Sequence, residues 1–197
     1  LSLAHTQEHI DLVFDNAPKE SDVTFAVGED SVMNDKTLTS IMLSAGAAID
    51  AVDLVMNKTL KSAFCATRPP GHHAEKTTAM GFCLFNNIVI ASRHAQQAHG
   101  AERVVVIDFD VHHGDGTEEI FTNDPHVLFC SSFQHPFYPY SGADTQADNI
   151  LNLPLPGGTG SKEWRSAIEQ QWLPALDSFT PQLIIISAGF DSHLEDD

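Results

Sequence analysis

Basic residues are scarce in this sequence of 197 residues: 10 Lys and Arg stand against 27 Asp and Glu, so the formal net charge is −17. Binding to nucleic-acid phosphates requires clustered Lys and Arg, and this scarcity excludes a non-specific nucleic-acid binder. The negative field would instead attract a cationic small molecule or a basic protein segment. Hydrophobic residues make up 42% of the chain and charged residues 19%, a balance typical of a folded protein rather than a disordered one.

Cysteines and long apolar runs are also few. Cys65, Cys83 and Cys130 are widely spaced in apolar surroundings, which predicts buried thiols in a reducing, cytoplasmic compartment. No run approaches the ~20 apolar residues of a membrane span, so we expect no membrane segment. The sequence has no signal peptide, begins at Leu1 and stops at Asp197, shortly after a strand-like run. Both ends look cut, and we expect a fragment of a longer protein whose oligomeric state stays open.

Apolar periodicity predicts alternating helices and strands. The predicted helices cover 37–56, 84–98, 117–121 and 161–179, the predicted strands cover 63–66, 103–109, 126–130 and 182–188, and a long loop covers 138–160. Asp35 is the expected cap of the first helix. Continuous apolar strands between helices predict a three-layer α/β/α fold with a mostly parallel sheet, in a single partial domain over residues 1–197.

Acidic and histidine side chains gather at three predicted strand ends, where the sites of parallel sheets form. They are His72 and His73 after the first strand, Asp108, Asp110 and His112 after the second, and Asp191 after the last. Five further histidines lie outside these groups and are expected at the surface: His5, His9, His94, His99 and His126.

The middle group indicates a divalent cation. If the strand persists to its end, Asp108, Asp110 and His112 project from one face, and such a group of side chains needs a positive partner. Asp110 and His112 would supply an oxygen and a nitrogen ligand, and Asp191 could be the third. Three ligands leave an open position for water, which is typical of a catalytic metal, and no Cys pair is spaced for a structural zinc.

Five segments of the sequence, in this order along the chain, match the motifs of a known protein family. They are RPPGHHAE at 68–75, GFCLFNN at 81–87, VIDFDVHHGDGTEEIF at 106–121, FYPYSG at 137–142 and SAGFDSH at 187–193. With them the sequence is similar to the histone deacetylase family of the arginase/deacetylase superfamily, and PPGHHA and GFC-FNN lean toward its class II-like and bacterial members, including acetylpolyamine amidohydrolases. The resemblance implies an arginase/deacetylase-like fold, truncated here at both ends.

The resemblance also implies a role for each matching residue. Asp110, His112 and Asp191 match the ligands of one zinc ion per chain, and His72 and His73 match the active-site histidines, with His73 as general base and acid. The other matches are Asp108 and Asp115 as carboxylates bonded to those histidines, Gly81, Phe82 and Tyr138 as the substrate channel, and Asp108, Asp110, His112 and Ser131 around a structural potassium ion. The implied substrate is an acetylated amine, either a lysine side chain or a polyamine.

One departure from the family pattern, one open question of metal identity and two alternative functions accompany the resemblance. Family members carry an oxyanion-stabilising tyrosine in a Gly-Gly-Tyr segment downstream of the third ligand, and this sequence stops at Asp197 before that point. The iron and cobalt ions could replace zinc at a site of two Asp and one His. A catalytically inactive binding module stays open, as does an arginase-like dimanganese ureohydrolase. Gly114 and His193 stand against the second alternative, because each occupies a position where such enzymes need an additional aspartate ligand.

Overall fold

A four-stranded parallel sheet organises the second half of the chain in the computed structural model, which describes residues 1–196. The chain forms two units, Leu1–Gly100 and Ala101–Asp197. The strands of the second unit are β3 (Val104–Asp108), β4 (Val127–Gln134), β5 (Ile150–Leu155) and β6 (Leu183–Ser187), in the order β5-β4-β3-β6. β3 and β4 are buried along almost their whole length, as expected of central parallel strands.

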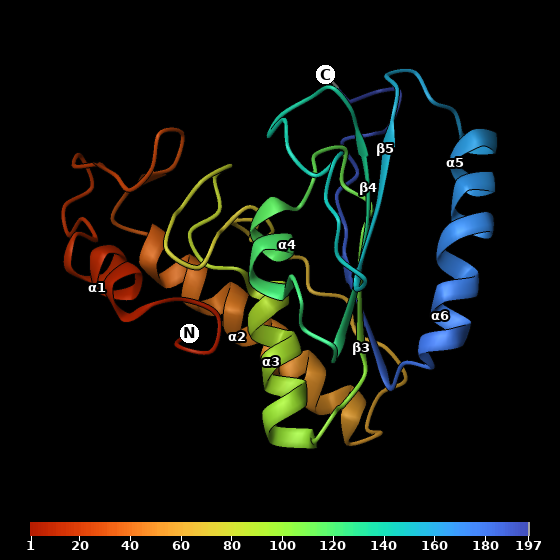
Figure 1. The fold of residues 1–197 in the computed structure, drawn as a ribbon. Helices are drawn as coiled ribbons and strands as arrows, with labels where there is room; N and C mark the ends of the chain where they lie inside the picture. Colours follow the sequence, from red (N-terminus) through yellow and green to blue (C-terminus); the bar gives the residue numbers. More distant parts are fainter. Residues whose placement is uncertain (197) are drawn as a thin grey trace. The chain divides into compact units, whose positions relative to one another are not determined.

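Helices cover both faces of this sheet (Figure 1). α4 (Asp115–Phe121) lies on one face, and α5 (Ser161–Ala167), a π-helical turn (Ile168–Trp172) and α6 (Leu173–Phe179) form a continuous segment on the other. The core beneath that segment consists of Val105, Leu128, Cys130, Leu153 and Trp172. The Trp172 indole packs there and donates a hydrogen bond of 3.1 Å to the Leu151 carbonyl. The predicted parallel α/β fold is confirmed.

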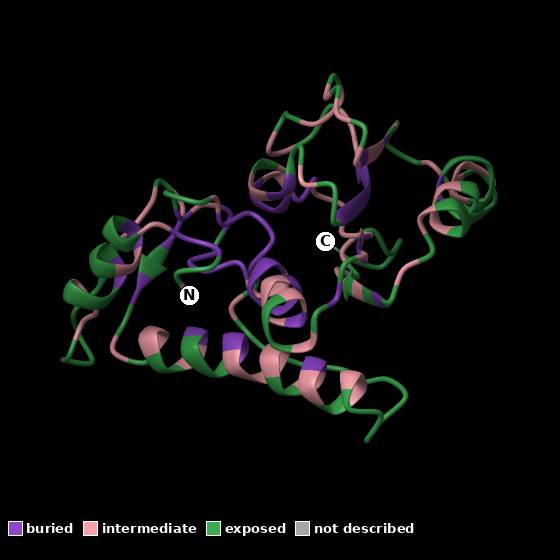
Figure 2. Ribbon diagram, turned by 60° about the horizontal axis from the view of Figure 1, so that its bottom comes forward, coloured by how far each residue is buried: buried purple, intermediate pink, exposed green. Residues whose placement is uncertain are grey.

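The first unit is built on two packed helices, α2 (Thr37–Met56) and α3 (Asn87–His99). The long helix at the bottom of Figure 2 is α2, with buried residues along one side and exposed residues elsewhere. Asn87 donates a hydrogen bond of 2.9 Å to Ser44 between the helices. The unit also contains α1 (Gln7–Asp15) and a short hairpin of β1 (Phe25–Ala26) and β2 (Val32–Met33).

Several predicted boundaries are wrong. α2 has its predicted bounds, but its cap is not Asp35: the Asn34 side chain accepts the Lys36 N–H at 2.9 Å. α3 starts three residues later than predicted, where Asn86 accepts the Val89 N–H and caps the helix. Residues 63–66 are irregular and exposed rather than a strand, because they pair with neither sheet. The predicted loop 138–160 contains β5, which pairs with β4.

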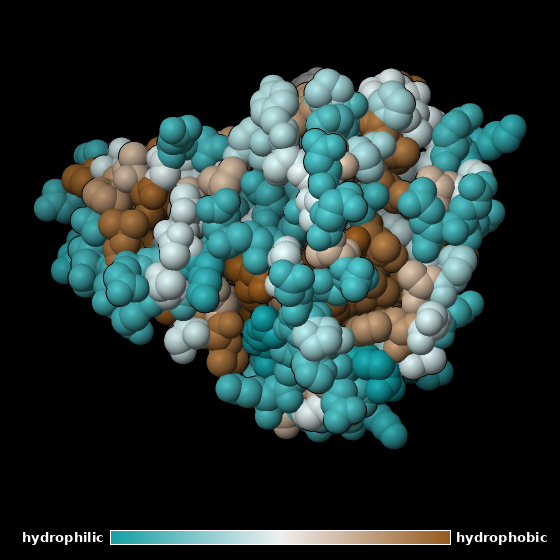
Figure 3. Space-filling model, viewed as in Figure 1, coloured by the Kyte–Doolittle hydropathy of each residue, from teal (hydrophilic) through white to brown (hydrophobic). Residues whose placement is uncertain are grey.

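Three expectations about single residues also change. Cys65 is exposed, so only Cys83 and Cys130 are buried thiols, and burial raises the pKa of Cys130 to about 12. His5 and His9, expected at the surface, are buried. Much of the face in Figure 3 is hydrophilic, with hydrophobic areas between the hydrophilic ones.

Among the described residues, α2 is a helix long and apolar enough to cross a membrane by length and composition. This differs from the expectation that no segment reaches that size. Polar residues such as Thr39, Ser40 and Asp50 interrupt its sequence, so no continuous apolar run indicates the high mean hydropathy of the helix. Core helices pass the same criterion, and α2 packs against α3 through a buried side that includes Ile41 and Val52.

Two buried histidines hold the N-terminal segment in place. The Nδ1 of His5 lies 2.9 Å from the Glu75 carbonyl, and its Nε2 accepts the Asn86 N–H at 2.9 Å. His9 contacts the Leu84 carbonyl at 2.8 Å, and both rings pack against Phe85. Since His5 accepts at one nitrogen, its ring is neutral. Burial, followed by the neighbouring His9, lowers the pKa of His5 to about 4.

The neutral His5 predicts an acid-sensitive fold. The folded protein resists protonation of His5 down to about pH 4, whereas the unfolded chain takes up the proton near pH 6.5. The stabilisation is therefore complete above pH 6.5 and is lost as the pH falls toward 4, by on the order of 3 kcal/mol. Urea unfolding followed by circular dichroism should show this loss in the unmodified protein and a smaller loss in His5→Gln. Equal pH dependence in both would contradict the assignment.

Candidate metal centre and its surroundings

The carboxyl end of β3 places two of the predicted ligands. Asp108 is the last residue of β3 and is fully buried. The strand stops there, so strand alternation does not align Asp108, Asp110 and His112 as predicted. Hydrogen bonds within the loop do this instead: Asp108 Oδ1 accepts the Asp110 N–H at 3.2 Å, and Asp110 Oδ1 accepts the His112 N–H at 2.8 Å.

The neighbouring strand β6 supplies the third predicted ligand. β6 runs parallel to β3 with Ser187 opposite Asp108, so the loops that follow the two strands leave the sheet side by side. The Phe109 N–H donates to the Ser187 carbonyl at 3.3 Å, and the Val111 N–H donates to Asp191 Oδ1 at 3.1 Å. These contacts fix Asp191, which follows β6, against the loop that carries Asp110 and His112.

The three side chains converge on one point. His112 Nδ1 lies 2.9 Å from Asp110 Oδ1 and 3.1 Å from Asp191 Oδ2. One ligand atom from each residue lies within 4.8 Å of the others, a spacing that can hold a metal ion. The side chains are partly exposed, at 16% for Asp110, 29% for His112 and 31% for Asp191. A bound ion would therefore be reachable from solvent.

The charges of this cluster depend on one another. Hydrogen bonds that His112 donates to Asp110 and then to Asp191 outweigh burial and raise the pKa of His112 to about 9. Burial opposes ionisation of Asp191, but His112, the Val111 N–H and Asp110 together lower the pKa of this carboxyl to about 2. Without an ion, a proton on His112 balances part of the charge of the two carboxylates. A divalent cation can take over this role by displacing that proton.

A glycine and two aromatic rings complete the surroundings. A Cβ on Gly189 would lie 2.0 Å from Asp110 Oδ2, so the close approach of the loop to this carboxylate requires glycine. The Phe137 ring stacks on His112 at a centroid distance of 5.2 Å, and the predicted channel residue Tyr138 meets it edge-on at 6.1 Å. The oxygen and nitrogen donors, together with this fit around Asp110, suit a divalent transition metal.

Sequence reasoning missed His113, which is fully buried behind this loop. Its Nδ1 lies 3.1 Å from Ser131 Oγ, and its Nε2 lies 2.9 Å from Glu118 Oε2. Burial opposes ionisation of Glu118, but bonds from His113, Thr145 and Asn152 lower its pKa. The adjacent pair His112-His113 was the signal, because consecutive residues leave a loop in different directions and one of them must face the interior.

The other predicted residues of the second unit lie near this network. Ser131 is the partner of Asp108 in the β3–β4 pairing, so two of the residues expected around potassium are neighbours across the sheet. Asp115 is the first residue of α4, and its N–H donates to the His113 carbonyl at 2.9 Å.

The first unit holds the histidine pair. His72 and His73 are both buried, with ring centroids 4.0 Å apart at 46°. Gly81 lies against His73, where a Cβ would come within 2.2 Å of the ring. Asp30, which sequence reasoning missed, accepts the Gly81 N–H with both oxygens at 2.9 and 3.1 Å.

The turn that carries Gly81 also presents Phe82. Met80 and Cys83 exchange backbone hydrogen bonds of 2.9 and 3.1 Å, and Gly81 and Phe82 between them have φ angles of +55° and +63°. Positive φ at both central positions is the geometry of a type I′ turn. Phe82 is 66% exposed, so it is not a core residue. A non-glycine residue with this φ is unusual and suggests a functional constraint.

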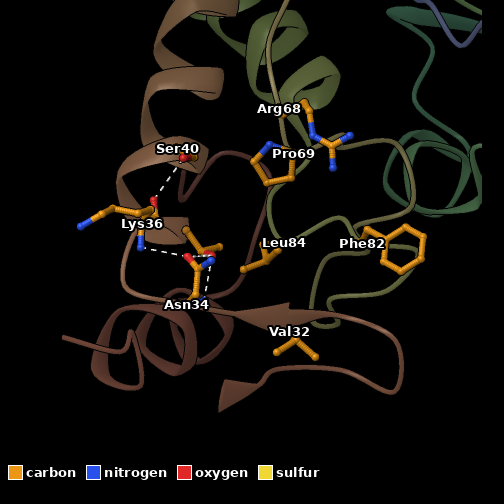
Figure 4. A pocket seen from close by; sticks show the side chains of 9 residues that line it. Val32, Asn34, Lys36, Ser40, Arg68, Pro69, Phe82 and Leu84 are labelled. Carbon is orange, nitrogen blue, oxygen red and sulfur yellow. Dashed lines mark hydrogen bonds between the residues drawn. The ribbon is translucent and has the colours of Figure 1, made fainter. Parts of the chain in front are cut away.

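A pocket of about 350 Å³ lies next to this turn in the first unit. Figure 4 shows Phe82 at one side of it, Val32 of β2 below, and Arg68 and Pro69 above. The remaining lining residues are Asn34, Lys36, Thr37, Ser40 and Leu84. The exposed Phe82 ring thus belongs to a concave surface.

Comparisons with known proteins agree with the motifs. Over 171 residues the chain is 42% identical to "Histone deacetylase 14, chloroplastic" of Arabidopsis thaliana, covering 81% of this chain and 40% of that protein. It is 39% identical to "Polyamine deacetylase HDAC10" of Rattus norvegicus over 211 residues, covering 100% of this chain and 36% of the relative. It is 40% identical to a "Histone deacetylase-like amidohydrolase" of Pseudomonas aeruginosa, covering 87% of this chain and 47% of the relative.

A solved structure, the "HDA15 HD domain", matches the fold with a TM-score of 0.92 and 37% identity, over 98% of this chain and 57% of that one. The chain thus spans about half or less of the length of these curated relatives. The family model of the histone deacetylase domain matches residues 1–197. This chain belongs to the histone deacetylase family.

Proposed function

We propose that this chain carries the metal-binding part of a zinc-dependent amidohydrolase that removes an acetyl group from acetyl-lysine or an acetylpolyamine. The observation that carries this proposal is the convergence of His112 on Asp110 and Asp191, at 2.9 and 3.1 Å, in a member of this family. Three such ligands leave a position for water and substrate. We also propose that both units belong to one catalytic domain, since the family match extends over residues 1–197.

Asp110, His112 and Asp191 are the residues that would hold the zinc ion. When bound, zinc supplies Lewis acidity that polarises an amide carbonyl and makes a water molecule acidic. The protein fixes the ligand geometry before the ion arrives, because backbone N–H groups of Val111 and His112 already orient the two carboxylates. Such preorganisation lowers the cost of assembling the site.

The histidine pair is proposed to move the protons of the hydrolysis. An amide needs a base that removes a proton from the attacking water and an acid that protonates the leaving amine. His72 and His73 are buried with rings 4.0 Å apart, so two positive charges there would repel strongly, which favours one neutral ring as the proton acceptor. We assign the general base and acid role to His73, with His72 beside it and Asp108 and Asp115 as carboxylates that orient the pair.

An acetylated amine with an apolar stem fits the aromatic residues. The exposed ring of Phe82, with Gly81 and Tyr138, would line the channel and contact methylene groups without requiring hydrogen bonds. A rat relative is named a polyamine deacetylase, and the net charge of −17 favours the approach of a cationic substrate. A potassium ion held by Asp108, Asp110, His112 and Ser131 is proposed in addition. The three free cysteines support a reducing, cytoplasmic setting.

The central test measures activity and zinc together in the natural full-length protein. Purified protein should contain zinc and hydrolyse a fluorogenic acetyl-lysine amide, N-acetylputrescine, or both. His112→Ala should lose the zinc of this site and the activity, because it removes the only nitrogen ligand. His126→Ala, which changes an exposed histidine outside the cluster, is the matched control and should retain both. Hydrolysis of neither substrate by a zinc-loaded protein would instead indicate a binding module.

The role of His73 has its own prediction. In His73→Asn, kcat should fall by ~10²–10⁴-fold while zinc content stays at the level of the unmodified protein, because general acid–base catalysis contributes about that much. Steady-state kinetics with elemental analysis measures this split. Loss of zinc in this variant would show that His73 supports the metal site rather than proton transfer.

The charge coupling at His112 predicts how zinc binding depends on pH. In the metal-free protein this imidazole should keep its proton until about pH 9, as followed by NMR, since Asp110 and Asp191 stabilise the charged form. Zinc must displace that proton, so its affinity should rise with pH up to about 9 and then level off. Titration of the ring near its ordinary pKa of ~6.5 would contradict the observed convergence of both carboxylates on it.

A further inference from the structure

A second group of metal-ligand side chains lies where α2 and α3 end. Asp53 is on the last turn of α2, and His94 and His99 are on the last two turns of α3. His94 Nε2 lies 2.7 Å from Asp53 Oδ1, and His99 Nε2 lies 2.6 Å from the same oxygen. The sequence predicted surface positions for both histidines, yet they are part-buried and point at one atom of a neighbouring helix.

The contacts of this group resemble those of the Asp110 cluster. Within residues 1–196, these are the two sets of three side chains whose ligand atoms all lie within 4.8 Å of one another. Both sets draw imidazole nitrogens and carboxylate oxygens to about hydrogen-bond distance around one point. In the Asp53 group the Nε2 atoms of both rings approach a single carboxylate oxygen, and the ring centroids lie 5.8 Å apart at 78°.

The local electrostatics favour a cation at this point. A helix C-terminus carries partial negative charge from its unpaired carbonyls, and two such termini meet here at the bottom of Figure 1. Asp53 adds a carboxylate to the last turn of α2, which contains no basic residue. A divalent cation between the two rings would offset this negative charge.

We propose that Asp53, His94 and His99 form a second metal site, which takes a divalent transition cation of the zinc class. Two imidazoles and one carboxylate form a donor set suited to Zn²⁺, Ni²⁺ or Cu²⁺, and poorly suited to Mg²⁺ or Ca²⁺, which prefer oxygen ligands. For metal–ligand distances of ~2.0–2.1 Å, tetrahedral ligands lie ~3.3 Å apart. The nitrogen–oxygen distances, now 2.6 and 2.7 Å, would lengthen toward this value when a metal binds, and small side-chain rotations supply such a change.

The exposure of the group indicates an exchangeable site. The side chains are 43% exposed for Asp53, 24% for His94 and 15% for His99. Solvent therefore reaches the remaining coordination positions, and a chelator can remove the ion. Because one ligand comes from α2 and two from α3, the ion would join the ends of the two helices and stabilise their packing.

Zinc alone is the probe that tests this site, added to the natural full-length protein after removal of bound metal. Equilibrium dialysis with elemental analysis should find two zinc ions per chain in the unmodified protein and one in Asp53→Asn or His99→Ala. Asp50→Asn, which changes an exposed carboxylate one turn earlier on α2, is the matched control and should bind two. The count of two includes the ion of the proposed zinc site; if that site binds no zinc, the unmodified protein should bind one ion and Asp53→Asn none, so failure of the proposed function stays distinguishable from failure of this site.

Two further readouts separate a metal site from a hydrogen-bonded cluster. Asp53→Asn keeps an oxygen that can accept hydrogen bonds from both histidines, so with a purely hydrogen-bonded role the zinc count should stay unchanged. At a metal site, added zinc should raise the melting temperature of His112→Ala but not of His112→Ala combined with Asp53→Asn. One zinc per chain in the unmodified protein, with no effect of Asp53→Asn on this number, would overturn the proposal.

Discussion

The parallel pairing of β3 with β6 is the constraint on which the metal centre depends. Its register places Ser187 opposite Asp108, and the two strands therefore release their loops at the same edge of the sheet. Asp191, which lies 79 residues after His112 in the sequence, reaches the imidazole only because of this pairing. The buried β-branched residues hold β3 in the sheet, and they thereby determine where the loops place the ligands.

The loop after β3 uses backbone hydrogen bonds to arrange charged groups. Each carboxylate binds a backbone N–H as well as the imidazole, so neither can rotate away without leaving an unsatisfied partner. His113 anchors the same loop from the interior through Ser131 and Glu118. These contacts hold His112 in place, with the two partly exposed carboxylates on one side and the buried network of His113 on the other.

The sequence was sufficient for the features that depend on local patterns. The 3.6-residue periodicity of α2 gave its bounds, and continuous apolar runs located β3 and β6. Asp110, His112 and Asp191 follow the runs that form β3 and β6, whereas the segment before His72 is not a strand.

Features that depend on tertiary contacts were missed. β5 contains Asn152 and Pro154, which are poor strand formers, and only its pairing with the buried β4 makes it a strand. The Asp53 group was invisible because its members are 41 and 46 residues apart, and the two histidines are separated by five positions on α3. Such spacing corresponds to no helical or strand repeat, and the three residues form a group only because α2 packs against α3.

Gly81 and Gly189 show how an absence of atoms can matter as much as a reactive group. One leaves room for the ring of His73 and the other for the carboxylate of Asp110. A saturation mutagenesis scan that selects for activity would therefore report these two glycines among the least tolerant positions, beside the histidine and the aspartate themselves. In such data a residue without a side chain would look like a member of the chemical machinery, although it contributes only empty volume.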